Sequence, residues 1–333
     1  MDTSFIANEL IAMLHIPVDS ILASPRKWRR QCGLPQPTKK DWDFIGKLER
    51  NSADLDQWIP NSRSIQVIET QCRSLSFYNY LEERMLSELR SYVNNGVHCV
   101  MLENIAAPYF SRDSIPVVIS GVMGCLAETL RRESPELHIG IQILAFGDNQ
   151  AMQIAVRKGL NFIRTESTLF KGTRPEGATP NNGNLAQLYL NREILAAEYG
   201  MSEVPDVIVD LQKKHTVFSD ELADLDLWLD TIVFEKLEGI IITGESTGTS
   251  ADLADLDKTR CKLDALQTKN KKLHGYSYSC PLFIGSGITL DTIEVCKKYS
   301  AGAIVGSEFK QGGFWENNLD PERVKQFMKV WNT

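Results

Sequence analysis

The stretch PLFIGSGITLDTIEVCKKYSAGAIVGSEFKQGG, residues 281–313, shows how the chain is organised. It reads as a strand at 282–284, a helix at about 289–299 and a second strand at 303–305. Each apolar run is short and stops at a glycine turn, as expected for a strand buried in a parallel sheet. The stretch therefore predicts an α/β protein in which strands and helices alternate.

The glycine turns after the two strands contain Gly285, Ser286, Gly287, Gly306 and Ser307. Glycines let backbone N–H groups approach an anion closely, and a helix N-terminus adds partial positive charge. Two such turns on neighbouring parallel strands would form one phosphate site, as in the loops after the seventh and eighth strands of a (β/α)8 barrel. The alternative is two ordinary strand-to-helix turns, because Gly-Ser is common in loops.

The rest of the chain repeats the same unit. Further apolar runs predict strands at 10–16, 97–102, 139–144, 160–165, 207–211 and 239–243. Amphipathic or capped segments predict helices at 77–94, 115–132, 147–158, 184–199, 219–236, 251–269 and 321–331. Eight strands alternating with eight helices predict one TIM barrel over residues 1–333. An open doubly wound sheet also alternates, but eight units ending on a two-turn phosphate motif favour closure.

One segment, residues 24–71, interrupts this alternation. It interleaves basic residues with three tryptophans and four prolines and shows no clear hydrophobic period. Basic residues among aromatics can bind nucleic acid, but acidic residues are mixed in. We interpret the segment as a long insertion between the first strand and its helix, a lid or a packed layer over or beside the C-terminal face.

The overall composition limits the functions to consider. The chain has 333 residues, 43% hydrophobic, with a net charge of -7, which argues against nucleic acid as the main partner. No apolar run approaches the roughly 18 residues of a membrane span. Seven scattered cysteines are typical of a reduced compartment, and the first residues are too few and too acidic for a signal peptide. We expect a cytoplasmic protein, compatible with a homo-oligomer; an organelle isoform with an added leader stays open.

Polar residues follow several predicted strands. Side chains at the C-terminal ends of barrel strands point toward one shared mouth, and His15, Glu103, Asp210 and His215 would lie there. Such a group suits a general acid–base pair or a divalent metal ion. We predict catalytic roles for Asp210, His215 and Glu103. The alternatives are a lysine partner for Asp210, pairing of Glu103 with Arg164, and histidines that merely pack.

Two further features lie near the predicted mouth. Lys214 could form a Schiff base or contact a substrate phosphate or carboxylate, although a solvated rim lysine is the ordinary reading. The loop from Thr243 to Gly248, TGESTG, is rich in hydroxyls and glycines, and we predict ligand contacts for Thr243, Gly244, Thr247 and Gly248, with a tight turn as the alternative. The P-loop pattern is absent from the sequence, which does not support P-loop nucleotide hydrolysis.

Four segments resemble the BtpA family: ITGESTGTSADL at 242–253, DLQKKH at 210–215, NFIR at 161–164, and the tail GSGIT…AGAIVGSEFK from 285. The resemblance covers about residues 9–23 and 76–330. The family is named for a cyanobacterial protein needed for photosystem I accumulation and is grouped with the ribulose-phosphate-binding barrels. The resemblance implies a single barrel with its functional face at the strand C-termini, and little about chemistry.

The sequence departs from the family pattern at two places. Ala107 stands where the family usually has an aspartate before its Pro-Phe. Residues 173–177 read TRPEG, where the family usually has a Thr-Asp-Gln-Gly element. Each departure removes a possible acid or ligand from the functional face.

Two hypotheses of function follow. The first is an enzyme of the lyase or isomerase type that acts on a small phosphorylated metabolite, with a divalent metal ion as a conceivable cofactor. The second is a non-catalytic binding or assembly factor that uses the barrel as a scaffold, as the family's photosystem I role implies.

Overall fold

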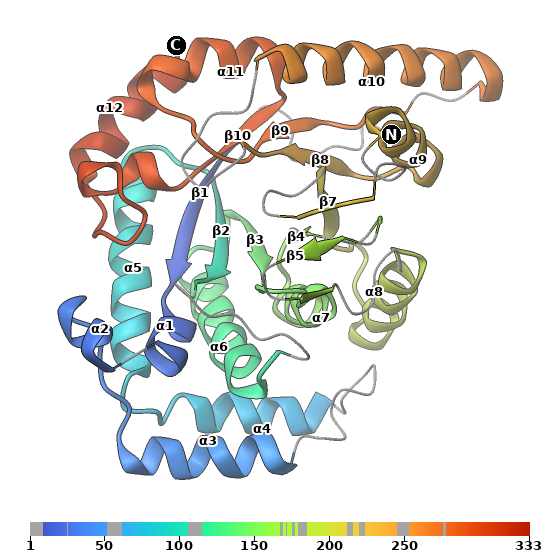
Figure 1. Ribbon diagram of the computed structural model, residues 1–333. Helices are drawn as coiled ribbons and strands as arrows, with labels where there is room; N and C mark the ends of the chain where they lie inside the picture. Colours follow the sequence, from blue (N-terminus) through green and yellow to red (C-terminus); the bar gives the residue numbers. More distant parts are fainter. Residues whose placement is uncertain are drawn as a thin grey trace.

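Eight parallel strands close into a barrel in the order β1-β10-β9-β8-β7-β4-β3-β2 (Figure 1). The computed structural model describes residues 9–24, 26–51, 62–105, 115–166, 169–170, 172–174, 177–178, 185–211, 216–219, 224–244, 253–275 and 278–333. The barrel strands are β1 (Glu9–Ile16), β2 (Cys99–Asn104), β3 (His138–Gln142), β4 (Phe162–Thr165), β7 (Asp206–Leu211), β8 (Gly239–Ile242), β9 (Leu282–Ile284) and β10 (Gly302–Val305). The predicted (β/α)8 barrel is confirmed.

A ring of helices surrounds the barrel, and each overlaps a predicted helix (Figure 1). They are α5 (Tyr78–Asn94), α6 (Val117–Glu133), α7 (Asp148–Lys158), α8 (Leu185–Tyr199), α9 (Leu225–Glu235), α10 (Leu253–His274), α11 (Ile293–Tyr299) and α12 (Pro321–Trp331). Short 3-10 turns lie at η1 (Leu290–Thr292), η2 (Ser307–Phe309) and η3 (Gln311–Gly313). A small hairpin, β5 (Thr173–Arg174) and β6 (Gly177–Ala178), follows β4 and was not predicted.

Helix α5 illustrates which side of an outer helix packs on the barrel. Leu81 and Leu89, eight residues apart, are buried, whereas Val93, four residues further on, is 45% exposed and Tyr92 is buried instead. A helix has 3.6 residues per turn, so a strict four-residue spacing rotates off the buried face within three steps. The Tyr92 hydroxyl donates to the Met13 carbonyl at 2.9 Å and ties α5 to β1.

The described residues of the 24–71 segment are mostly helical, which the lack of a clear hydrophobic period did not predict. With the residues before and after them, they form four helices: α1 (Val18–Ala23), α2 (Arg26–Gln31), α3 (Lys39–Asn51) and α4 (Ser62–Cys72). The buried positions of α3 and α4 include Ile45, Leu48 and Ile68, whereas Trp42 lies on the exposed side. In Figure 1, α3 and α4 lie side by side against α6, in the direction in which the arrows of β1 and β2 point.

Two contacts bind this layer to α6. The Glu49 carboxylate on α3 accepts hydrogen bonds from the backbone N–H groups of Val117 and Val118, at 3.1 and 3.0 Å. These are the first residues of α6, whose orphan donors and positive dipole end favour an anion. On α6, Gly121 and Gly124 leave room for α4, because a Cβ at Gly121 would lie 2.7 Å from Cys72 Sγ and one at Gly124 would meet a Glu69 oxygen.

The seven cysteines are all free thiols, as the scattered spacing predicts. Among the described residues, no helix is long and apolar enough to cross a membrane.

Candidate active site

The barrel interior is filled by one apolar cluster that every strand but β3 supplies. Its members are Ile11, Met13, Cys99, Met101, Phe162, Ile208, Ile241, Phe283 and Ile304. On β3 the inward position is Gly140, because a Cβ there would meet the Phe162 ring. Side chains of a strand alternate between its two faces, so the next inward position is two residues toward each strand's C-terminus.

That next step defines a second inward layer, which we call the polar layer. It comprises His15, Glu103, Gln142, Arg164, Asp210, Thr243, Gly285 and Gly306. Six strands contribute a polar side chain, and the neighbouring strands β9 and β10 contribute glycine. The register places Glu103 between His15 and Gln142. The polar layer therefore closes the apolar interior and forms the floor of the C-terminal mouth.

A buried ion pair lies in this floor. The Arg164 guanidinium donates to both carboxylate oxygens of Asp210, with distances of 2.9 and 3.3 Å from Nη2. Arg164 is 5% exposed and Asp210 is fully buried. Burial by itself lowers the pKa of Arg164, but the charges of Asp210, Glu103 and Glu166 outweigh it and raise that pKa above its usual value. Asp210 is thus paired with an arginine, where the sequence suggested a lysine.

His15 and Glu103 form a second acid–base contact, on neighbouring strands. His15 Nε2 lies 4.0 Å from Glu103 Oε1, and both side chains are largely buried. The indole of Trp315 meets the His15 ring edge-on, with centroids 6.4 Å apart. A Cβ at Gly306 would lie 2.9 Å from His15 Cε1, so glycine at this position makes room for the imidazole.

The predicted phosphate turn after β9 is connected to the end of β8. The Gly244 N–H donates to Ser286 Oγ at 2.9 Å, so the serine hydroxyl joins two loops of the mouth. Gly287 has a φ of 71°, a left-handed conformation that favours glycine. The turn after β10 leads directly into η2, which begins at Ser307.

Lys310, which ends the second glycine turn, points away from the mouth. Its ammonium group is fully buried and lies 2.7 Å from a carboxylate oxygen of Glu88 on α5. Burial lowers the pKa of Lys310, against the opposing effect of Glu88. This lysine therefore fastens the turn to the helix layer.

Several predicted residues lie outside the described residues: Lys214, His215, Thr247, Gly248 and Ala107. Two residues of the departing TRPEG segment, 175 and 176, lie outside as well. Among the described positions, no three histidine, cysteine or acidic side chains are grouped as metal ligands.

Two residues of the polar layer were not among the predicted site residues. Arg164 was considered only as a partner for Glu103. Gln142 is the one polar side chain inside the predicted strand at 139–144, IGIQIL, and this interruption was a usable signal. Neither polar atom of its carboxamide has a hydrogen-bond partner among the described residues.

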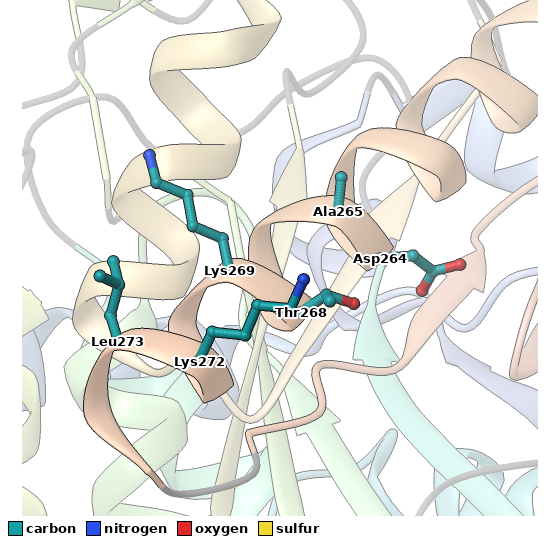
Figure 2. Close-up of a pocket in the computed structure, with 6 residues that line it drawn as sticks. All are labelled: Asp264, Ala265, Thr268, Lys269, Lys272 and Leu273. Carbon is teal, nitrogen blue, oxygen red and sulfur yellow. The ribbon is translucent and has the colours of Figure 1, made fainter.

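A surface hollow on α10 lies elsewhere (Figure 2). Six side chains from one face of this helix line it: Asp264, Ala265, Thr268, Lys269, Lys272 and Leu273. They belong to the second half of α10, which returns the chain to the start of β9 and hence to the barrel end opposite the mouth. The hollow is built by a single helix and lacks the converging strands of the mouth.

The fold and the polar layer define a TIM-barrel protein with a charged mouth at the strand C-termini. Residues 76–333 match the model of the BtpA family, and the chain belongs to that family. The chain is 31% identical over 260 residues to an uncharacterized mitochondrial protein of Caenorhabditis elegans, which covers 75% of this chain and 84% of that protein. It is 26% identical over 250 residues to the photosystem I biogenesis protein BtpA of Synechocystis, covering 74% and 78%.

Two solved structures also resemble the chain. The N-(5'-phosphoribosyl)anthranilate isomerase of Pyrococcus furiosus superimposes with a TM-score of 0.41 at 14% identity, covering 74% of this chain and 94% of the isomerase. The tryptophan synthase of Mycobacterium tuberculosis gives a TM-score of 0.45 at 12% identity, covering 74% and 84%.

Proposed function

We propose that this protein is an enzyme of the lyase or isomerase type that acts on a small phosphorylated metabolite bound in the mouth. The division of the polar layer carries the proposal: glycines follow β9 and β10, and ionisable side chains lie on β1, β2, β4 and β7. A phosphate needs space and backbone N–H groups, whereas proton transfer next to a carbonyl needs a positioned acid or base. The glycine turns after β9 and β10 offer the space and the N–H groups, and the side chains on the other strands offer the acid or base.

The phosphate would lie at Gly285–Gly287 and Gly306–Ser307. In the barrel order, β9 is four strands from β3 and β10 is four strands from β4, so the glycine turns lie across the mouth from Gln142 and Arg164. The Glu103 carboxylate would repel a phosphate on its own side of the mouth, whereas the charge of Asp210 is balanced by the Arg164 guanidinium. Charge therefore favours the phosphate on the glycine side.

Glu103 is the best placed residue to move a proton, with His15 as its partner. The sequence favoured Asp210 or His215 for this step, but both oxygens of Asp210 contact the Arg164 guanidinium. We assign Asp210 to holding that guanidinium in the floor of the mouth. The roles of His215 as a proton carrier and of Lys214 as an amine or phosphate contact stay predictions, as does a divalent metal ion.

The test is a thermal-shift screen of the purified protein against phosphorylated sugars and nucleotides, with and without divalent metal. A ligand at one hundred times its Kd adds about 2.7 kcal/mol of stability, which such a screen detects. Ser307→Asp should abolish the shift by bringing a like charge to the phosphate, while the neutral variant Ser307→Asn should keep it. An equal shift in the wild type and Ser307→Asp would reject the phosphate site.

A second candidate function is the capture of a protein partner. It is favoured by a mostly apolar hollow between α4, α6 and α7, outside the barrel. Its lining residues are Ile65, Ile68, Ile115, Val117, Ser120, Gly121, Gln150, Gln153, Ile154 and Arg157. The name of the Synechocystis relative, photosystem I biogenesis protein BtpA, agrees with such a role.

Deleting the 24–71 segment would not be a clean test of this candidate, because its helices α3 and α4 pack against α6. Point substitutions are the better test. Ile65→Lys would place a charge in the hollow, and Val67→Lys on the same helix is the matched control, since Val67 is 56% exposed and does not line the hollow. Partner capture should be lost only in Ile65→Lys. Equal capture by both variants would remove this candidate.

A further inference from the structure

Gln142 is a buried carboxamide without a hydrogen-bond partner. It ends β3 and is 1% exposed, and neither its Oε1 nor its Nε2 is paired within the described part of the chain. A buried amide without partners is costly, and native proteins pair almost all such groups. In the floor of a barrel mouth, such an exception indicates a group that binds a ligand.

The side chains on both sides of Gln142 explain why its amide has no hydrogen-bond partner among the described residues. Glu103 lies beside it on β2, and the register of β3 with β4 brings Arg164 to its other side. Arg164, however, directs its guanidinium to Asp210. The amide therefore presents a donor and an acceptor to the mouth, between a carboxylate and an occupied guanidinium.

A second polar atom without a partner lies across the mouth. Thr243 Oγ1, at the end of β8, is buried and unpaired among the described residues. A Cβ at Gly285 would lie 3.0 Å from Thr243 Cγ2, so this side chain lies next to the β9 glycine turn. Both orphan groups belong to the polar layer, and both can donate and accept hydrogen bonds.

We infer that Gln142 and Thr243 bind the hydroxyl groups of the substrate, which is then a phosphorylated polyhydroxy compound of the sugar phosphate class. This inference rests on the proposed function and names its substrate class. Glu103, beside Gln142 on β2, offers acceptor oxygens, so a ligand that brings donors fits there and a second anion would be repelled. A hydroxyl donates to a carboxylate while it accepts from the Gln142 amide. The phosphate lies across the mouth at β9 and β10, and the hydroxyl-bearing carbons reach toward β3.

The test uses Gln142→Met, which keeps the length of the side chain and removes its polar atoms. In the free protein the variant should be at least as stable as the wild type, because an unsatisfied buried amide is replaced by an apolar group. Its affinity for pentose and hexose monophosphates should fall about 10-fold, the worth of one or two hydrogen bonds. Its affinity for inorganic phosphate and methyl phosphate should be unchanged. Gln66→Met on the exposed side of α4 is the matched control and should alter none of these values.

The outcomes separate this inference from the proposed function. If both phosphate probes bind and Gln142→Met affects no sugar phosphate, the inference is wrong while the phosphate site stands. A loss confined to nucleoside monophosphates would assign the amide to a base and overturn the sugar assignment. If Gln142→Met lowers the melting temperature and leaves every affinity unchanged, the amide has a structural role and the inference fails. If the wild type binds none of these probes, both proposals fail.

Discussion

Asp210 and Arg164 form a fully buried, two-oxygen ion pair at the bottom of the mouth, on neighbouring strands β7 and β4. The pair is part of the floor on which a ligand would lie. Two charges removed from water are tolerable only while they stay together, because each alone would carry its full desolvation cost.

Breaking this pair should destabilise the protein strongly. Asp210→Asn leaves the Arg164 guanidinium buried without its counter-charge, so we expect a loss of about 3–5 kcal/mol in urea unfolding at pH 7. The double variant Arg164→Met/Asp210→Leu should recover most of that loss, because no charge is left buried. A change below about 1 kcal/mol in Asp210→Asn would show that the pair is solvated. A loss of activity in an Asp210 variant can therefore result from unfolding, so its free energy of unfolding must be measured as well.

Glu103→Gln should slow proton transfer without weakening substrate binding. The variant keeps the size of the side chain and removes its ability to accept a proton. We expect exchange of a substrate carbon-bound proton with solvent deuterium, followed by NMR, to fall by about 100-fold or more. Substrate affinity should change little. Glu133→Gln, on the exposed end of α6, is the control, and an unchanged exchange rate in Glu103→Gln would move the proton transfer to another residue.

Stability should fall as the pH rises from about 4 to 7. Burial raises the pKa of Asp19 from 3.8 to about 7, opposed by the hydrogen bond that Asn104 donates. In this interval the folded protein keeps a proton that the unfolded chain releases, so each pH unit costs about 1.4 kcal/mol. Asp19→Asn should flatten this part of the stability curve.

Asp206 contributes to the same pH window. Burial, and then the charge of Glu238, raise its pKa to about 7 as well. Asp206→Asn should therefore remove a second, separate part of the slope, and the double variant should remove more than either single one. The free energy of unfolding is measured with urea at pH 4, 5.5 and 7 for both proteins. If it changes with pH equally in Asp19→Asn and in the wild type, Asp19 is ionised in the folded protein.

Two glycines in helices should respond oppositely to alanine. In Gly124→Ala the new methyl group meets Glu69, which is fixed by ion pairs to Arg157 and Lys158 at 2.8 and 2.7 Å, so we expect a loss of about 1–3 kcal/mol. In Gly46→Ala the methyl group meets only the flexible end of Arg50, and the helix should gain about 0.5–1 kcal/mol. Melting curves of the two variants check both signs. A stabilised Gly124→Ala would mean that α4 does not pack closely on α6.

The fold was predictable because its signals are local. Each barrel strand is a short apolar run and each outer helix is one continuous segment between or after such runs, so their alternation is readable without knowing any contact. The helices of the 24–71 segment were missed because each buries few positions: α3 turns Ile45 and Leu48 inward while Trp42, the largest apolar residue, stays outside. Amphipathicity with so few apolar residues does not stand out in a sequence.

The site was predictable only in part. Which side chains point into the barrel, and which of them pair with each other, is decided by the closed barrel. Glu103 and Asp210 could be placed near the mouth by their position at strand ends. The partner of Asp210 was missed although β4 and β7 are consecutive barrel strands and hence neighbours in the sheet, because the strand pattern does not say which side chains of neighbouring strands pair. Gln142 was overlooked because its strand was expected to continue to 144, which put the residue mid-strand rather than at the floor of the mouth.

The two glycines of α6 also bear on how this protein can change over evolutionary time. With α4 in place, Gly121 and Gly124 are the residues that let the helices approach. Without α3 and α4, the same helix would have two flexible residues in its middle, an apolar side open to water and no acidic cap at its first turn. Loss of the 24–71 segment would therefore not leave the barrel unchanged, because α6 would lose its acidic cap and its apolar cover together.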